Sequence, residues 1–247
     1  MRRSLLVIAV AAGVVGTAQL SYAADMPVKA PIYTAPFFGA YNWAGFYVGG
    51  NVGYGWDNHD ATAYDFAGVL TGTSSQERRG IFGGGQAGYN FMVNPNLLLG
   101  IEGDFDLADL TGSNDACGTV GCSHSDGKDS WFATARGRAG YVMNNWLIFA
   151  TGGAAWVHSS SVRTITASNN QAVVGEVATG TSTHPGWTVG GGVEYGFAPR
   201  WSAGLEYLYI QTSGTTDFIY PTPSADRHVD STSHLNTVRF AVNYHFN

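Results

Sequence analysis

Residues 238–246, close to the C-terminus, alternate strictly between two kinds of side chain. The apolar set is Val238, Phe240, Val242, Tyr244 and Phe246, and the residues between them are Arg239, Ala241, Asn243 and His245. A period of two indicates a β-strand, because successive side chains of a strand point to opposite faces. One face of this strand suits hydrocarbon and the other suits water. The segment therefore needs an apolar environment on one side and needs partner strands along its edges.

The same alternation recurs in seven earlier segments, so the last strand, 233–247, has partners. The expected strands are 43–56, 79–93, 97–109, 129–143, 146–159, 184–197 and 200–211. Each contains the roughly 9–11 residues that a tilted strand needs to cross a bilayer. The segment 146–159 is apolar in both phases over its first half, and we place its outward set at Trp146, Ile148, Ala150, Ala154 and Trp156.

The connections between these strands alternate in length. Three are very short (94–96, 144–145 and 198–199), and four are long and polar (57–78, 110–128, 160–183 and 212–232). Short turns on one rim and long loops on the other are typical of transmembrane barrels, whose closed ring leaves no unpaired edge in lipid. We therefore predict an all-β fold, an eight-stranded antiparallel up-and-down transmembrane β-barrel.

The composition agrees with a barrel and argues against several functions. Glycine accounts for 34 of 247 residues, aromatic residues reach 13%, and charged residues only 12%. Chains of this kind favour many short strands over helices. The formal net charge of -6 disfavours nucleic acid as a partner, since nucleic-acid binding needs a basic surface.

The N-terminal part of the chain has the features of an export signal. Arg2 and Arg3 precede a short apolar run, and Ser21-Tyr22-Ala23 fits a signal-peptidase site. We therefore divide the chain into a signal peptide (1–23), a proline-containing periplasmic linker (24–42) and an outer-membrane barrel (43–247).

The inward phase of the predicted strands carries both signs of charge. An eight-stranded barrel is just wide enough for side chains to fill it, and buried charges must be paired or hydrated. Acids and arginines can therefore form a mixed network that plugs the lumen; the alternative is a narrow gated pore. The predicted lumen network is Glu102, Asp104, Asp106, Arg136, Arg138, Glu194, Glu206 and Arg239.

Other candidate sites in the sequence are weaker. Cys117 and Cys122 are expected to form a local disulfide in an exported protein; the rival interpretation is a metal site that includes His124. The glycine motif at 83–88 lies within a strand pattern, which argues against a nucleotide site. No Gly-x-Ser-x-Gly elbow occurs, so we expect neither an enzyme nor a bound cofactor.

Several stretches resemble one family. Trp-Ala-Gly-Phe-Tyr-Val-Gly-Gly-Asn-Val-Gly-Tyr-Gly-Trp at 43–56 is similar to the first strand of the small outer-membrane immunogenic proteins of alphaproteobacteria. These are opacity-like, porin-family relatives of the outer-membrane protein A barrel. The segments 24–27, 150–156 and 236–239 look similar too, so the resemblance spans almost the whole mature chain.

The resemblance implies a localisation and a set of partners. It implies an outer-membrane barrel with a role in envelope integrity, surrounded by lipid and lipopolysaccharide and inserted by the barrel-assembly machinery. In that family the machinery recognises a terminal aromatic residue, which would be Phe246, although Asn247 follows it here. The alternatives are a narrow channel for small solutes, or surface loops that bind haem or a host ligand through histidines. The histidines expected in loops are His59, His124, His184, His228 and His234.

Overall fold

The computed structural model describes residues 41–246 except 65–67, 119–120, 169–172 and 219–226. The described strands are β1 (Gly45–Tyr64), β2 (Leu70–Asn94), β3 (Leu97–Gly118), β4 (Gly121–Met143), β5 (Trp146–Ser168), β6 (Val177–Ala198), β7 (Trp201–Phe218) and β8 (Arg227–His245). The predicted signal peptide and nearly all of the predicted linker lie outside the described residues. Within the described part, no helix is long and apolar enough to span a membrane.

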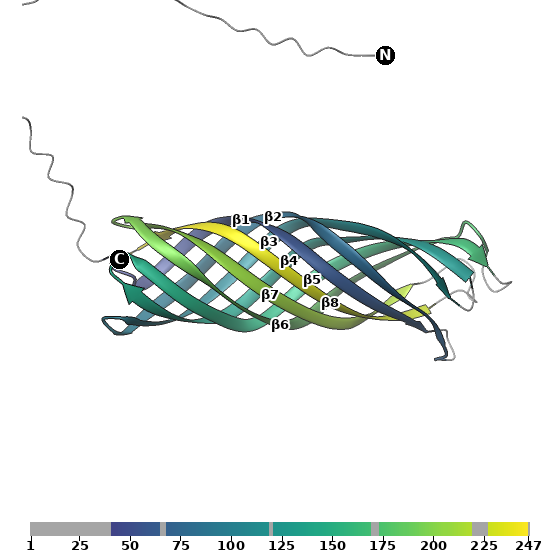
Figure 1. Ribbon diagram of the computed structural model, residues 1–247, viewed down its shortest axis with the longest axis horizontal. Coiled ribbons are helices and arrows are strands. Elements are labelled where there is room, and N and C mark those ends of the chain that lie inside the picture. The colour runs from purple at the N-terminus through teal and green to yellow at the C-terminus, as the bar shows by residue number, and fades with distance from the viewer. Residues whose placement is uncertain (1–40, 65–67, 119–120, 169–172, 219–226, 247) are drawn as a thin grey trace, which may run out of the picture. The chain divides into compact units, whose positions relative to one another are not determined.

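The eight strands form one closed ring in chain order (Figure 1). Every neighbouring pair is antiparallel, and β8 pairs with β1, so that Val48 lies opposite Tyr244 and Val52 opposite Phe240. The predicted fold class is confirmed. Closure satisfies the backbone groups of both terminal strands, which is the condition for placing a sheet in hydrocarbon.

Three short turns join the strands at one end of the barrel, which we call the turn end. In the first turn, the side chain of Asn94 accepts hydrogen bonds from the backbone N–H groups of Asn96 (3.0 Å) and Leu97 (2.8 Å). In the second, Asn144 has φ 55°, a left-handed conformation that asparagine tolerates better than most residues. The local sequence thus fixes both turns.

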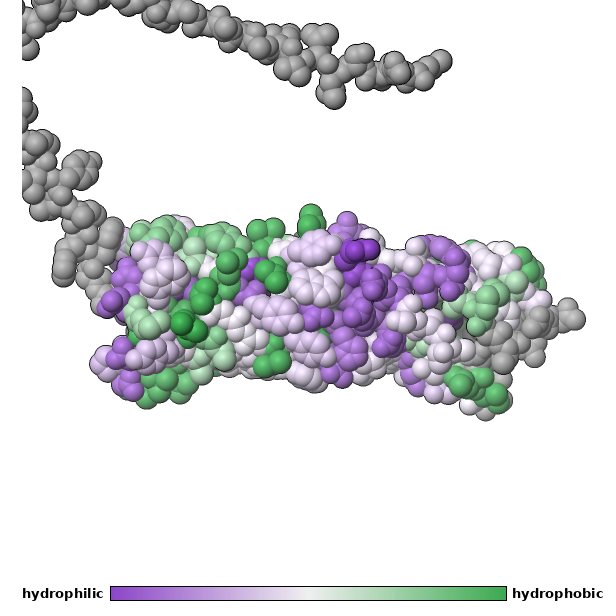
Figure 2. Space-filling view, viewed as in Figure 1, coloured by the Kyte–Doolittle hydropathy of each residue, from purple (hydrophilic) through white to green (hydrophobic). Residues whose placement is uncertain are grey.

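The predicted alternation governs which side chains face outward. Large apolar residues such as Ile101 (63% exposed) and Leu107 (64%) lie on the outside, whereas Glu102 and Asp106 on the same strand are buried. The outward set proposed for the ambiguous fifth segment is exposed in the structure. On the face shown in Figure 2, hydrophobic residues are frequent near the end with the C-terminus, and hydrophilic ones gather along the middle.

The strands are much longer than predicted, because their outer ends run through segments that we expected to be loops. β1 continues to Tyr64, and β2 begins at Leu70, so most of 57–78 is paired strand. Most outward side chains in these extensions are polar, with the exceptions Leu70, Val162 and Val177, so the regular hydrophobic alternation stops where the sheet leaves the membrane. The backbone ladder nevertheless continues in water. We call this part of the barrel the outer end.

The N-terminal approach to β1 closes the turn end. Trp43 is almost fully buried and Tyr41 is 8% exposed, and their rings lie 4.5 Å apart. The indole N–H of Trp43 donates to the backbone oxygen of Asn144 (3.5 Å). We placed the end of the linker at residue 42, but Tyr41 already packs inside the barrel.

Candidate functional site

The lumen of the barrel is organised in layers. Along β4, the inward-facing residues run from Val142 at the turn end through Arg138 and Arg136 to Phe132. The inward residues of β3 follow the same order, from Leu98 through the three acids to Leu110, whereas β8 brings the polar His245 and Asn243 to the turn end. Because side chains at similar heights meet in the lumen, each class forms a layer across the barrel.

Arg136 is the centre of the charged layer. Its guanidinium contacts three carboxylates: Glu102, Asp104 (2.8 Å) and Glu206 (2.6 Å). Glu102 and Arg136 lie opposite each other on β3 and β4, whereas Glu206 reaches across from β7. Thr134 also donates a hydrogen bond to Asp104 (2.5 Å). The arginine side chain is completely buried, so these acids provide its charge compensation.

Two further arginines complete the layer. Arg239 on β8 lies 2.5 Å from Glu206, 3.3 Å from Glu102, 3.5 Å from Asp104 and 3.7 Å from Asp106. Arg138 pairs with Glu194 and lies 3.7 Å from Glu102, and its guanidinium lies 3.9 Å from the centre of the Phe149 ring. The last contact is a cation–π interaction that helps to hold a buried charge.

All eight charged residues named from the sequence therefore lie in one buried network. Their partners from β1, β7 and β8 were not named from the sequence. Tyr47 donates to Glu102 (2.5 Å), and Glu194 accepts hydrogen bonds from Ser202 (2.5 Å) and Asn243 (2.8 Å). The inward phase of these strands could have identified them. Their contacts with particular acids depend on the register.

An apolar layer lies on each side of the charges. At the turn end it comprises Tyr41, Trp43, Leu98, Val142 and Leu147. Toward the outer end it comprises Phe82, Leu110, Phe132, Ala155, Val157, Leu208, Ile210 and Leu235. None of these side chains is more than 8% exposed. The charged layer thus lies between two apolar clusters, and at the turn end the buried polar residues Ser202, Asn243 and His245 lie beside the apolar one.

One arrangement near the turn end has the residue types of a hydrolase. The hydroxyl of Ser202 lies 3.0 Å from Nε2 of His245, a pair that the search for a Gly-x-Ser-x-Gly elbow did not detect. The hydroxyl donates to Glu194 (2.5 Å), however, and both Ser202 and His245 are fully buried. A nucleophile must be reachable by substrate, so this cluster is a structural hydrogen-bond network.

A second polar layer lies beyond the outer apolar layer. Arg78 forms an ion pair with Asp129 (2.8 Å) and a hydrogen bond to Gln76 (2.9 Å), and Asp57 accepts a hydrogen bond from Ser233 (2.6 Å). We had assigned Arg78 to a loop. The residue faces the lumen because the strands continue past the predicted boundary.

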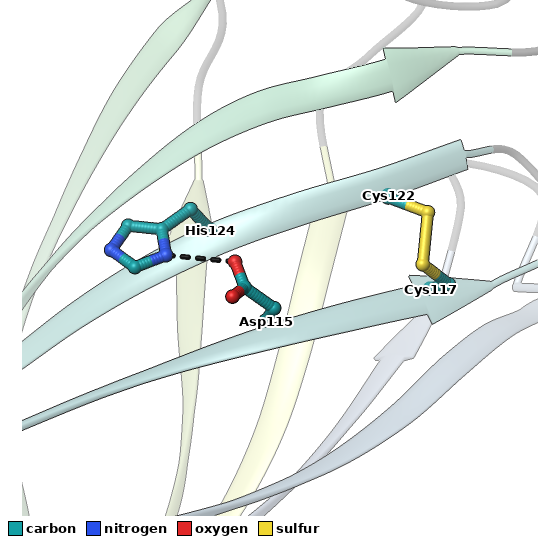
Figure 3. Close-up of a disulfide and its surroundings, with 4 residues drawn as sticks. All are labelled: Asp115, Cys117, Cys122 and His124. Carbon is teal, nitrogen blue, oxygen red and sulfur yellow. Dashed lines mark hydrogen bonds and ion pairs between the residues drawn. A yellow bond between two sulfur atoms is a disulfide. The ribbon is translucent and has the colours of Figure 1, made fainter.

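The cysteines close the hairpin between β3 and β4. Cys117 and Cys122 form a disulfide, as predicted, and His124 lies apart from it with its ring turned to Asp115 (Figure 3). The rival metal site is therefore not formed. Among the described residues, no three histidine, cysteine or acidic side chains are arranged to hold a metal ion.

The other histidines expected in loops are distributed over several places. His59 and His184 line a cavity within the outer end. His228 contacts Asp217 (2.6 Å), and His234 contacts the hydroxyl of Tyr209 (2.7 Å). All four belong to strands: the loop assignment is wrong for His59 and His228, whereas His184 and His234 fall within the predicted strands 184–197 and 233–247.

His124 gives a prediction for pH. Its Nδ1 donates to Asp115 (2.8 Å), and Nε2 lies 3.4 Å from Asp126. The hydrogen bond to Asp115, together with the charges of both aspartates, raises the pKa of His124. A raised pKa stabilises the fold below the ordinary histidine pKa of about 6.5, and this contribution is lost as the pH rises through the folded value. NMR titration should show a midpoint above 6.5, and Asp115→Asn should lower it.

The disulfide gives a prediction for local stability. It joins residues only five apart at the tip of a hairpin, where the loop-closure model gives about 2 kcal/mol. We expect reduction to accelerate amide hydrogen exchange in 113–126 and to leave exchange around Glu102 and Arg138 unchanged. A general increase in exchange over the barrel would contradict a purely local role.

The comparison with known proteins decides the family. Residues 8–246 match the family described as outer membrane protein beta-barrel domain. The chain belongs to this family. It is an outer-membrane β-barrel protein, as predicted from the sequence.

Relatives of this barrel family come from alphaproteobacteria. The 31 kDa outer-membrane immunogenic protein of Brucella melitensis biotype 1 is 31% identical over 235 residues, which cover 91% of this chain and 92% of the relative. The 22 kDa outer membrane protein of Rhizobium leguminosarum bv. viciae is 28% identical, with 86% and 82% coverage. These names describe outer-membrane proteins, not enzymes.

Among solved structures, the barrel is similar to OprG of Pseudomonas aeruginosa. The TM-score is 0.46 at 12% identity, with 82% of this chain and 97% of OprG covered. The outer-membrane protease OmpT of Escherichia coli gives the same TM-score at 9% identity, with 81% and 97% coverage. Neither similarity bears on function.

Proposed function

We propose that this protein is a non-enzymatic structural barrel of the outer membrane, with a closed lumen and an outer end displayed at the cell surface. The observation that carries the proposal is the enclosure of the charged network between two apolar layers. A structural role in the envelope requires a stable, impermeable wall, and this interior supplies one.

The layers oppose conduction for two physical reasons. A hydrated ion that passes Leu110 and Phe132 would have to lose its water in an apolar layer, which costs several kcal/mol or more. It would then meet arginines whose charge is already balanced by Glu102, Glu206 and Asp104. Opening a path would break several buried ion pairs at once, at about 3–5 kcal/mol each.

Conductance in planar bilayers tests the closed lumen. The protein should first show heat-modifiable migration on a gel, which reports a folded, detergent-resistant barrel. Folded protein is then expected to produce no reproducible single-channel steps. Stable steps of uniform size from folded protein would favour the alternative function, a narrow channel for small solutes.

The display of the outer end follows from the topology. The disulfide hairpin lies at the end opposite the short turns, and short turns face the periplasm in barrels of this kind. Intact cells treated with a reductant and a membrane-impermeant maleimide should become labelled at Cys117 and Cys122. Labelling only after lysis would show that the hairpin faces the periplasm.

Haem binding, which we expected in loops, is a second candidate function, suggested by the number of histidines, all of which the structure places on strands. Of these, His59 and His184 share a cavity lined mainly by hydroxyl and amide side chains. Haemin titration followed by the Soret band tests this function directly. A shift that disappears in His59→Ala and His184→Ala would support it, and an unshifted spectrum would remove it.

A further inference from the structure

Positive charge is scarce on the outside of the barrel. Among strand residues whose side chains are described, only Arg79 on β2 and Lys128 on β4 are outward-facing cations; the other strand arginines point into the lumen. Arg200, the remaining described cation, lies in the last turn, at the opposite end. The two outward cations therefore lie on the same side of the ring, separated by one strand.

Both cations lie just beyond the apolar outer surface. Going toward the outer end, Arg79 is the next outward-facing residue beyond Ile81 on β2. On β4, Lys128 likewise lies beyond Trp131 toward the outer end. The register places Arg79 opposite Thr111 and Thr111 opposite Lys128. At about 4.8 Å between strands, the two positions are roughly 10 Å apart. The side chains therefore project into the headgroup region of the outer leaflet.

A hollow in the outer surface lies beside Arg79. It has a volume of about 340 Å³ and lies on the outward face of the paired strands β1 and β2, with Tyr54 and Trp56 on its apolar side and Asn58, Glu77 and Arg79 on its polar side. Trp56 is directly opposite Arg79 in the register. The hollow thus changes along the strands from aromatic to polar and charged, and both the acidic Glu77 and the basic Arg79 line its polar side.

The guanidinium of Arg79 is free to take an external anion. Lys128 is held by Asp109 at 2.7 Å. By contrast, the side chain of Arg79 forms no hydrogen bond or ion pair with other described residues. An arginine presents several N–H groups in a fork that matches the oxygens of a phosphate group. Trp56 beside it offers a flat amphipathic ring suited to the boundary between acyl chains and headgroups.

We propose that the hollow at Tyr54, Trp56 and Arg79 binds the headgroup of a phosphorylated outer-leaflet lipid. Arg79 contacts the phosphate, and Lys128 adds a longer-range attraction that Asp109 attenuates. The rings of Trp56 and Tyr54 cover the part of the lipid where the acyl chains begin. The proposal depends on the orientation of the barrel in the membrane and does not depend on whether the lumen conducts.

Native mass spectrometry of the folded protein in a neutral detergent tests the proposal. The probe is lipid A, a glycolipid with two phosphates, and phosphatidylcholine is the zwitterionic comparison. Arg79→Gln should weaken lipid A binding about fivefold, the effect expected for one cation near a membrane surface. Arg200→Gln is the matched control, since it removes the same charge from the opposite rim, and should leave the affinity unchanged.

The remaining outcomes separate the possible sources of the phosphate. Millimolar inorganic phosphate should not compete with lipid A, because it lacks the chains that contact Trp56. Trp56→Ala should weaken lipid A binding and leave the gel shift on heating intact. Equal affinities of wild type and Arg79→Gln, equal losses in the Arg79 and Arg200 variants, or displacement by inorganic phosphate would overturn the proposal.

Discussion

Replacing Arg136 by methionine is expected to lower the free energy of unfolding by about 3–5 kcal/mol, because it leaves buried carboxylates without their main counter-charge. Arg136 touches Glu102, Asp104 and Glu206, and its side chain is completely buried. Methionine keeps much of the packing volume, so the loss of unfolding free energy measures the effect of removing the positive charge. Urea unfolding in lipid vesicles, followed by tryptophan fluorescence, measures it.

Two further variants make this result specific. Arg200→Met removes the same charge from an exposed turn, where the guanidinium donates a hydrogen bond to the hydroxyl of Tyr244 (3.2 Å), and should change stability by less than about 0.5 kcal/mol. Adding Glu102→Gln to Arg136→Met should recover part of the loss, because it removes one of the unpaired charges. If Arg136→Met and Arg200→Met lowered the free energy of unfolding by the same amount, the result would show that the buried network does not stabilise the barrel.

Replacing Ile101 by arginine is expected to cost about 2–4 kcal/mol, the penalty for an arginine at the middle of the bilayer on the lipid face of a barrel. Ile101 is 63% exposed and lies midway along the apolar face of β3. The same unfolding experiment in vesicles measures this cost, which arises from transferring a charge into hydrocarbon.

The matched control places the same arginine where the barrel faces water. Thr181 is exposed on β6 beyond Trp187, so Thr181→Arg should cost no more than about 1 kcal/mol. A larger loss of unfolding free energy for Ile101→Arg than for Thr181→Arg would place Ile101 in the hydrocarbon and Thr181 in water. Equal costs at Ile101 and Thr181 would mean that the apolar band is not in lipid.

The sequence predicted the ring of strands and the inward charges for the same physical reason. A strict period of two assigns each residue to a face, so Glu102 and Arg136 could be placed in the lumen without coordinates. Which acid meets which arginine was not predictable. Glu102 and Arg136 are neighbours through the register of β3 and β4, but Glu206 reaches Arg136 from across the lumen.

The outer end was missed because its outward residues face water. Hydrophobic alternation reports where one face of a strand is in lipid, and it stops at Trp56 and Trp187 although β1 and β6 continue. Beyond those residues the strands remain paired through backbone hydrogen bonds around an inward apolar cluster of Ala63, Ile165, Ala178, Phe218 and Val229, but the outward phase gives no hydrophobic signal. Arg78 was missed because the second strand was predicted to begin at Arg79, and Asp129 because a register shift beside it places its side chain in the lumen, out of the strict alternation.

The central claim is that apolar side chains cover the outside of the barrel and that its lumen is packed and closed. Contacts between methyl groups and lipid test this claim most directly. In a nuclear Overhauser spectrum of methyl-labelled protein in lipid nanodiscs, Ile101, Val52 and Leu205 should show cross-peaks to acyl chains. Leu110, Leu208 and Ile210, which are buried in the lumen, should show none. Acyl-chain cross-peaks to Leu208 and Ile210, with none to Ile101 and Leu205, would contradict the account.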